Sequence, residues 1–254
     1  MKISTTPHRN KIRLWAVLIW LAVWQVASLW VGEAILLASP VSVFLRLVQL
    51  CQTGDFWGSI LFSLIRILLG FLLGLLCGGL FAGLAAFLRP VEELLSPLML
   101  VMKTTPITSI IILCLIWIPS RNLSIFTAFL MVFPIIYTNL LEGIRATDPQ
   151  LIEMAELFQV PWHKRVRYIY LSQLIPYLRS ACTVSVGLSW KAGAAAEVIG
   201  IPKGSIGEHL YDAKLYLDTP DLFAWTIVII CMSILFERVF LWALSNLLKR
   251  LERM

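Results

Sequence analysis

The sequence has 254 residues, of which 59% are hydrophobic and only 14% are charged, and its mean hydropathy is +0.84. A soluble domain would carry roughly a quarter charged residues, so the composition excludes a water-soluble protein and indicates an all-α, multi-pass membrane protein. The formal net charge of +6 could suggest nucleic-acid binding. Most basic residues, however, lie in short segments that flank apolar runs, and we expect no nucleic-acid partner.

Six apolar runs are candidates for membrane spans, because a helix needs about 20 mainly apolar residues to cross a bilayer. They cover approximately residues 13–32, 60–88, 94–117, 122–141, 178–199 and 222–244. The first run follows Lys2, Arg9, Lys11 and Arg13, as the core of a signal peptide would. It is longer than the roughly 7–15 residues of such a core and no clear cleavage site follows, so we interpret it as an uncleaved first span.

The second run is rich in glycine. Gly70, Gly74 and Gly78 recur every four residues, which places them on one face of a helix where a neighbouring helix can approach closely. Two interpretations stay open at this point. Packing within one subunit is favoured over a seam between two copies.

Basic residues are distributed unevenly between the two sides of the predicted membrane protein. With a cytoplasmic N-terminus, the inner segments hold fourteen of them and the outer segments hold only Arg46, Arg121, Lys203 and Lys214. This positive-inside bias predicts that both termini and the segment 142–177 are cytoplasmic. The outer segments 33–58 and 200–221 could form a cap against an external partner.

The segment 142–177 contains a charged, partly helical stretch. After Pro149, apolar residues at helical spacing predict a short amphipathic helix that Pro161 interrupts, and a second helix is expected to begin near Trp162. The polar face of the first helix includes Glu153 and Glu156. Such a helix can press apolar residues into a partner's groove while its charges set the orientation, although an ordinary helix on the inner membrane face is the alternative.

The spacing in this segment resembles the E-A-A…G…I-x-L-P loop of ABC importer permeases, in the branch that includes nitrate, sulfonate and taurine permeases. The matching residues are Glu153 and Ala155 of E-A-A, Ile169 and Leu171 of I-x-L, and Pro176, a second proline of this branch. Met154, Gln159 and Ser172 depart from the pattern and replace an alanine, a glycine and a proline. Glycine would permit positive φ without strain, so Gln159 predicts either a different turn or tolerated strain.

The resemblance covers roughly residues 55–250. It includes the segments Ser63–Arg66, Leu69–Phe71, Lys103–Pro106, Gly187–Trp190, Ala195–Glu197 and Ile199–Gly200. It implies a type I ABC importer permease bundle of six transmembrane helices that forms a single domain over residues 1–254. It also implies a cell-membrane location and partners in membrane lipid, a second permease copy (a homodimer is expected), a cytoplasmic ABC ATPase dimer and an extracellular or periplasmic substrate-binding protein.

Within this resemblance, ATP and Mg bind to the partner ATPase subunits and no cofactor binds to this chain. ATP binding would close the ATPases, push on the loop and switch the pathway from inward-facing to outward-facing. The residues implied in coupling are Glu153, Met154, Ala155, Glu156, Leu157, Phe158, Gln159, Val160 and Pro161. Ala155 is expected to allow close approach of the ATPase, against which a larger side chain would clash.

Three ionisable residues in or near the predicted spans, Lys103, Lys191 and Glu197, are candidates for the translocation pathway. Ionisable groups at membrane depth are costly, and they often line a pathway or pair internally. Lys191 on the pathway would favour an anionic solute, but pairing with a carboxylate or snorkelling is equally open. Arg66 is expected to anchor packing.

Other functions find little support in the sequence. Its three histidines form no H-E-x-x-H motif, no nucleophile elbow is present, and the cysteine spacing indicates no metal site, so an enzyme is not expected. The absence of a G-x-x-x-x-G-K-[ST] motif means that a separate subunit must hydrolyse ATP. A self-contained secondary transporter or channel is the alternative, although no internal repeat is evident. We expect a small anionic or heterocyclic solute, similar to nitrate, sulfonates, taurine or a vitamin precursor.

Overall fold

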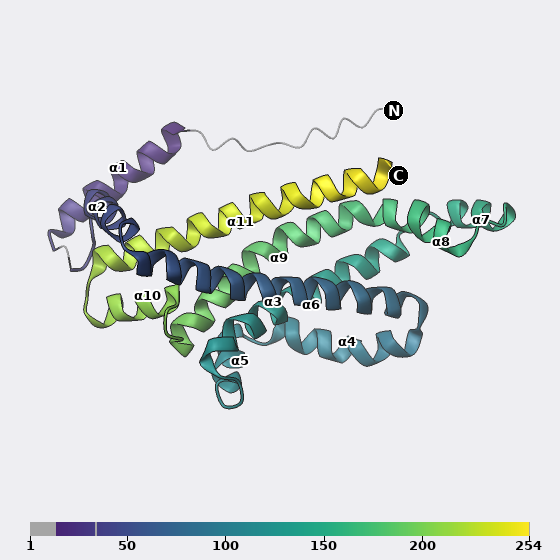
Figure 1. Cartoon of the computed structure of the whole chain (residues 1–254), viewed down its shortest axis with the longest axis horizontal. Coiled ribbons are helices and arrows are strands. Elements are labelled where there is room, and N and C mark those ends of the chain that lie inside the picture. The colour runs from purple at the N-terminus through teal and green to yellow at the C-terminus, as the bar shows by residue number, and fades with distance from the viewer. Residues whose placement is uncertain (1–13, 34, 254) are drawn as a thin grey trace.

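The computed structural model describes residues 14–33 and 35–253, which are built from helices and short connections. The helices are α1 (Leu14–Val31), α2 (Pro40–Cys51), α3 (Gly54–Phe87), α4 (Arg89–Thr104), α5 (Ile107–Cys114), α6 (Ser120–Arg145), α7 (Pro149–Leu157), α8 (Trp162–Arg165), the π-helical turn η1 (Val166–Tyr170), α9 (Leu171–Gly200), α10 (Ile206–Leu215) and α11 (Thr219–Arg253). In Figure 1 the axes of the long helices α3, α6, α9 and α11 lie roughly parallel to one another. Helices α7 and α8 lie at the end where α11 finishes, whereas α2 and α10 lie at the opposite end (Figure 1).

Helix α3 packs directly onto α6 through its glycine face. A Cβ atom on Gly70 would lie 2.3 Å from the carbonyl oxygen of Ile125, and one on Gly74 would lie 2.7 Å from the Cβ of Val132. Gly78 faces α6 at a similar distance. Because these positions have room only for hydrogen, they permit a close backbone approach. This confirms that the glycine face packs within the subunit.

Helices α9 and α11 complete the core from the other side. The ring centroid of Phe236 on α11 lies 5.6 Å from that of Phe71 on α3 and 6.3 Å from that of Trp190 on α9. Phe71 and Trp190 are fully buried. Large aliphatic side chains cover the outward face of α3 instead: Leu61, Ile65, Leu69, Leu73, Leu76 and Leu80. Such a surface suits contact with hydrocarbon.

Three helical stretches in the described part of the chain are long and apolar enough to cross a membrane, namely Gly54–Phe87, Ser120–Arg145 and Thr219–Asn246. The bent pair α4–α5 would be a fourth. Helix α9 has 30 residues and is long enough to cross, but polar residues such as Lys191 and Glu197 keep it outside this apolar class. The predicted run 13–32 corresponds to α1, a shorter apolar helix within the described residues.

The predicted span over residues 94–117 is sharply bent in the structure. Helices α4 and α5 meet there at an angle of 103°. Thr105 between them is extended, with φ −74° and ψ 130°, and Pro106 directly precedes α5 as its N-cap residue. Proline disfavours helical backbone at the residue before it and lacks an amide proton to continue the hydrogen-bond ladder, so Pro106 accounts for the break.

Both predicted outer segments contain a helix that the hydropathy pattern did not indicate. The hydroxyl of Ser39 accepts a hydrogen bond from the amide of Ser42 at 3.1 Å and caps α2. The hydroxyl of Ser205 accepts one from the amide of Glu208 at 3.0 Å and caps α10. The Ser-Pro pair before α2 and the S-x-x-E pattern before α10 were the available sequence signals.

Candidate coupling segment and translocation face

The predicted short helix after Pro149 is present as α7. The Asp148 carboxylate caps it by accepting a hydrogen bond from the amide of Gln150 at 2.9 Å. At the other end of α7, Leu157 and Phe158 are 82% and 73% exposed. Two adjacent, large and exposed apolar side chains at the tip of a loop are typical of a surface that a partner covers.

The residues of α7 divide into an outward and an inward set. Glu153, Met154 and Glu156 are exposed, whereas Ala155 is only 1% exposed. The expectation that Ala155 faces the ATPase is therefore corrected, because its methyl group packs inside this chain. A large side chain at this position would disturb the loop itself before it could clash with a partner.

The chain turns sharply after α7 at Gln159, which has a φ of 50°. The amide of Val160 donates a hydrogen bond to the carbonyl of Ala155 at 2.9 Å. Arg165 holds the turn from α8, because its Nε donates to the carbonyl of Val160 at 2.7 Å and its guanidinium pairs with Glu156 at 3.2 Å. Of the two possibilities for this turn, the structure shows the strained one, in which glutamine adopts the left-handed conformation that glycine favours.

We expect the Gln159→Gly variant to close the turn at least as tightly as the natural sequence, whereas Gln159→Val should loosen it. A non-glycine residue in the left-handed region costs roughly 1–2 kcal/mol, and a β-branched one is a stronger outlier. Trypsin cleavage after Lys164 and Arg165 reports local opening of the segment. Equal cleavage rates for the glycine and valine variants would contradict a left-handed turn.

Aromatic side chains attach this coupling segment to the end of α3. The Phe87 ring centroid lies 5.3 Å from that of Trp162 and 6.3 Å from that of Tyr170. Nearby, Arg145 at the end of α6 pairs with Glu92 at the start of α4. The coupling segment, residues 142–177, therefore contacts α3 through Phe87 and α4 through Glu92.

The three candidate pathway residues occupy different environments. Lys103 is exposed in the last turn of α4, next to the break at Pro106, and Lys191 is exposed on α9. Glu197 is 1% exposed. In the described ranges, no hydrogen bond or ion pair joins any two of them. They do not form a single charged cluster.

Lys191 lies on a face of α9 that the rest of the subunit leaves uncovered. The other members of this small-residue face, at helical spacing along α9 and at least partly exposed, are Ser180, Thr183, Val184, Gly187 and Ala194. The contrast with the exposed leucines of α3 is clear, because small and polar side chains with a lysine are unsuited to lipid contact. Ionisable residues in spanning helices almost always face a bundle interior or a water-filled space.

Glu197 joins three helices at the α10 end of the bundle. Its Oε2 accepts a hydrogen bond from the Ser63 hydroxyl on α3 at 2.6 Å, and the same hydroxyl accepts one from the amide of Ile206 on α10 at 3.1 Å. A Cβ on Gly207 would lie 2.3 Å from the backbone carbon of Glu197, so α10 rests directly on α9. Glu197 is thus placed inside the subunit, and the expectation that it lines the pathway is corrected.

Arg66 lies beside this group and contacts the start of α6. Its Nε donates to the carbonyl of Arg121 at 2.5 Å, and its guanidinium lies 3.6 Å from the ring centroid of Phe62. These contacts confirm that Arg66 anchors packing.

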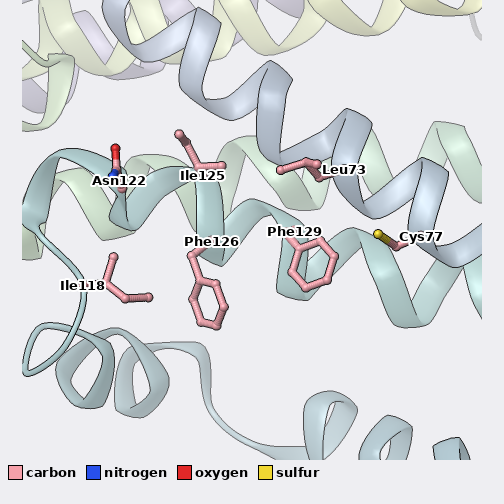
Figure 2. A pocket seen from close by; sticks show the side chains of 7 residues that line it. All are labelled: Leu73, Cys77, Ile118, Asn122, Ile125, Phe126 and Phe129. Atoms are coloured by element: carbon pink, nitrogen blue, oxygen red, sulfur yellow. The ribbon is translucent and has the colours of Figure 1, made fainter.

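A separate hollow of about 460 Å³ lies between α3, α6 and the α5–α6 connection. Figure 2 shows Phe126 and Phe129 pointing from α6 into it, with Leu73 and Cys77 on α3. Asn122 supplies a polar group, and the rest of the lining is apolar or weakly polar. This hollow offers no charged group that would select an anion.

The comparisons with known proteins decide the family. A family model described as "Binding-protein-dependent transport system inner membrane component" matches residues 70–253. The chain belongs to this family. It is the membrane-embedded permease subunit of a binding-protein-dependent ABC importer and not itself an enzyme.

Curated relatives within this permease family differ in the solute that they are named for. The aliphatic sulfonates transport permease SsuC of Bacillus subtilis (strain 168) is 29% identical over 82% of this chain and 76% of its own length. The riboflavin transport permease RibX of Chloroflexus aurantiacus is 30% identical over 91% of this chain and 85% of its own length. The family is common to both, but the solute is not.

A solved structure supports the fold. The chain matches "Crystal structure of an amino acid ABC transporter with histidines" with a TM-score of 0.61 and 22% identity, over 82% of this chain and 98% of that chain. The helical arrangement described above is therefore that of an ABC permease. Family membership in a binding-protein-dependent system also implies an ATPase and a substrate-binding protein as partners.

Sequence reasoning missed the hydrogen-bond partners of Glu197, and it placed Leu157 and Phe158 in the coupling segment without predicting how exposed they are. Ser63, Ile206 and Gly207 could not be connected with Glu197, since Ser63 is 134 residues away along the chain. The exposure of Leu157 and Phe158 followed only from the direction in which α7 docks. An apolar pair directly before a glycine-like turn was the signal available for this exposure.

Proposed function

We propose that the chain forms half of the translocation pathway for a small anionic solute and couples this pathway to the ATPase through residues 142–177. The small-residue face of α9, with its exposed Lys191, carries the proposal. A cation on a face unsuited to lipid can attract an anion where little water competes. The named relatives include a sulfonate permease, which supports an anion, and a riboflavin permease, which makes a heterocycle the alternative.

The proposed orientation has six membrane crossings in one permease domain over residues 1–254, with both termini in the cytoplasm. The excess of basic residues in the inner segments supports it. In Figure 1, α7 and α8 lie at the same end of the bundle as the end of α11. Lys164, Arg165 and Arg167 of this end are consistent with the cytoplasmic side, whereas α10 carries Glu208 and Asp212 toward the outside.

The proposed assembly contains two copies of this chain. The small-residue face of α9 is uncovered by its own subunit, so a second copy is required to close the pathway opposite Lys191. ATP and Mg bind to the two ATPase subunits, which press on the exposed Leu157 and Phe158 of each copy. An external substrate-binding protein delivers the solute at the α10 end, in the cell membrane of the host.

Purification and reconstitution test the proposal. The complex of this chain with its ATPase, purified from the host membrane, should contain equal numbers of permease and ATPase subunits. It should contain a single type of permease chain. In liposomes with the substrate-binding protein, it should accumulate radiolabelled ethanesulfonate or another small anion in an ATP-dependent manner. Accumulation of riboflavin alone would overturn the anionic assignment, and recovery of two different permease chains would overturn the homodimer.

A further inference from the structure

Two glycines on α3 differ from the three that contact α6. A Cβ on Gly79 would meet only the Cδ1 of Leu140, at 3.7 Å, and a Cβ on Gly83 would meet nothing within 4 Å. Neither position therefore needs glycine for helix packing. Instead, both line a cavity of about 260 Å³ at the end of α3 nearest the coupling segment.

The cavity is apolar on every side. Gly79, Gly83 and Phe87 stand four residues apart on α3, and the tyrosine of η1 contributes its ring. The remaining lining residues are aliphatic and come from α6, η1 and α9: Leu140, Ile144, Val166, Leu171, Leu174 and Leu178. Apolar cavities of about 150 Å³ in proteins stay dry and accept apolar ligands, so water is not the natural occupant of this one.

The surroundings of the cavity indicate its occupant. Leu80 and Leu84 directly follow the two glycines in the sequence, and they are 61% and 38% exposed on the outward surface of α3. The helix that lines the cavity therefore also carries a face that suits hydrocarbon. Arg89 and Arg167 are exposed close in sequence to the lining residues Phe87 and Val166. Neither arginine forms an ion pair within the part of the chain that the structure describes.

We propose that this cavity binds one acyl chain of an anionic phospholipid, whose headgroup is held by Arg89 and Arg167. An apolar slot beside a leucine surface matches the chain, and two unpaired arginines match a phosphate. The bound chain would lie against η1, the turn through which the coupling segment continues into α9. This lipid site goes beyond the proposed function. If the proposed orientation holds, the bound lipid belongs to the cytoplasmic leaflet, and this is the only part of the proposal that rests on the orientation.

Photolabelling of the full permease–ATPase complex in lipid nanodiscs tests this proposal. The probes are phosphatidylglycerol and phosphatidylcholine that carry a diazirine at the end of one acyl chain, each added to phosphatidylcholine discs. Peptide mapping should find the phosphatidylglycerol label concentrated on residues 79–87 and 166–178 rather than on the outward leucines at 61–73. Equal labelling of both regions would overturn the acyl-chain site, and equal labelling by both probes would overturn the headgroup assignment.

A variant whose side chain fills the cavity provides a second, independent test of the lipid site. Gly83→Leu should lower labelling of residues 166–178 about tenfold, because the new side chain takes the space of the acyl chain. Gly58→Leu is the matched control on the same helix, since a Cβ there also meets nothing within 4 Å but lies far from the cavity. Undiminished labelling of Gly83→Leu in an intact complex would overturn the proposal. If that variant fails to assemble, the map on the natural sequence still decides.

Discussion

Replacement of Lys191 by methionine should lower ATP-dependent solute uptake at least about tenfold, since a tenfold change corresponds to about 1.4 kcal/mol. Two opposite unit charges 4 Å apart attract each other by about 4 kcal/mol at an effective dielectric constant of 20. Losing even half of this attraction between lysine and solute costs more than the roughly 1.4 kcal/mol that corresponds to a tenfold change. Methionine keeps the length of the side chain and removes its charge. Because Lys191 is exposed on α9, the fold has little to lose from the change.

The measurement is initial uptake into proteoliposomes that contain the permease, its ATPase and the binding protein. Lys191→Arg keeps the charge and should retain most uptake, and Lys203→Met removes a charge from the connection between α9 and α10. If Lys203→Met impairs uptake as strongly as Lys191→Met, net charge rather than a pathway cation is responsible. Normal uptake by Lys191→Met would show that the solute does not meet this lysine.

Replacement of Phe158 by aspartate should weaken docking of the ATPase about a hundredfold and abolish coupled transport. Phe158 is 73% exposed at the tip of the coupling segment, so its ring has little to stabilise within its own subunit. Burying such a side chain in a partner contributes about 1.5–3 kcal/mol, and central aromatic contacts at interfaces often cost more than 2 kcal/mol when they are removed. A carboxylate in the same groove adds a desolvation penalty.

Docking can be measured as retention of the ATPase on immobilised permease, alongside ATP hydrolysis stimulated by the binding protein. Leu215→Asp is the matched control, because Leu215 is the last residue of α10 and is 61% exposed. Helix α10 lies at the opposite end of the bundle from α7 (Figure 1). This variant should leave docking of the ATPase unchanged. Retention of the ATPase by Phe158→Asp at the natural level would mean that another surface forms the interface.

Local chemistry explains what could be predicted from the sequence. The interruption at Pro161 and the face formed by Gly70, Gly74 and Gly78 follow from backbone rules that act over a few residues. The same rules, applied to Pro106, account for the break between α4 and α5 inside the apolar run 94–117. A hydropathy window averages over the position at which a single proline acts.

Contacts between distant segments could not be predicted in this way. Nothing near Glu197 in the sequence indicates that the Ser63 hydroxyl would donate a hydrogen bond to its carboxylate. From the sequence, a buried Glu197 and a Glu197 exposed to the pathway were therefore equally consistent. The direction of Ala155 also depends on how α7 docks on its own subunit, which is a property of the packed bundle. Lys191 remains the pathway candidate because its exposure follows from the same packing that buries Glu197.

The joint formed by Glu197, Ser63 and Gly207 has a thermodynamic consequence. Helix α9 runs without interruption for 30 residues, about 45 Å at 1.5 Å per residue, from η1 to Glu197 and the residues after it, on which α10 rests. A protein bound to α10 and one bound to the coupling segment therefore act on the positions of one shared helix. By linkage, if the binding protein changes the affinity for the ATPase by some factor, the ATPase must change the affinity for the binding protein by the same factor.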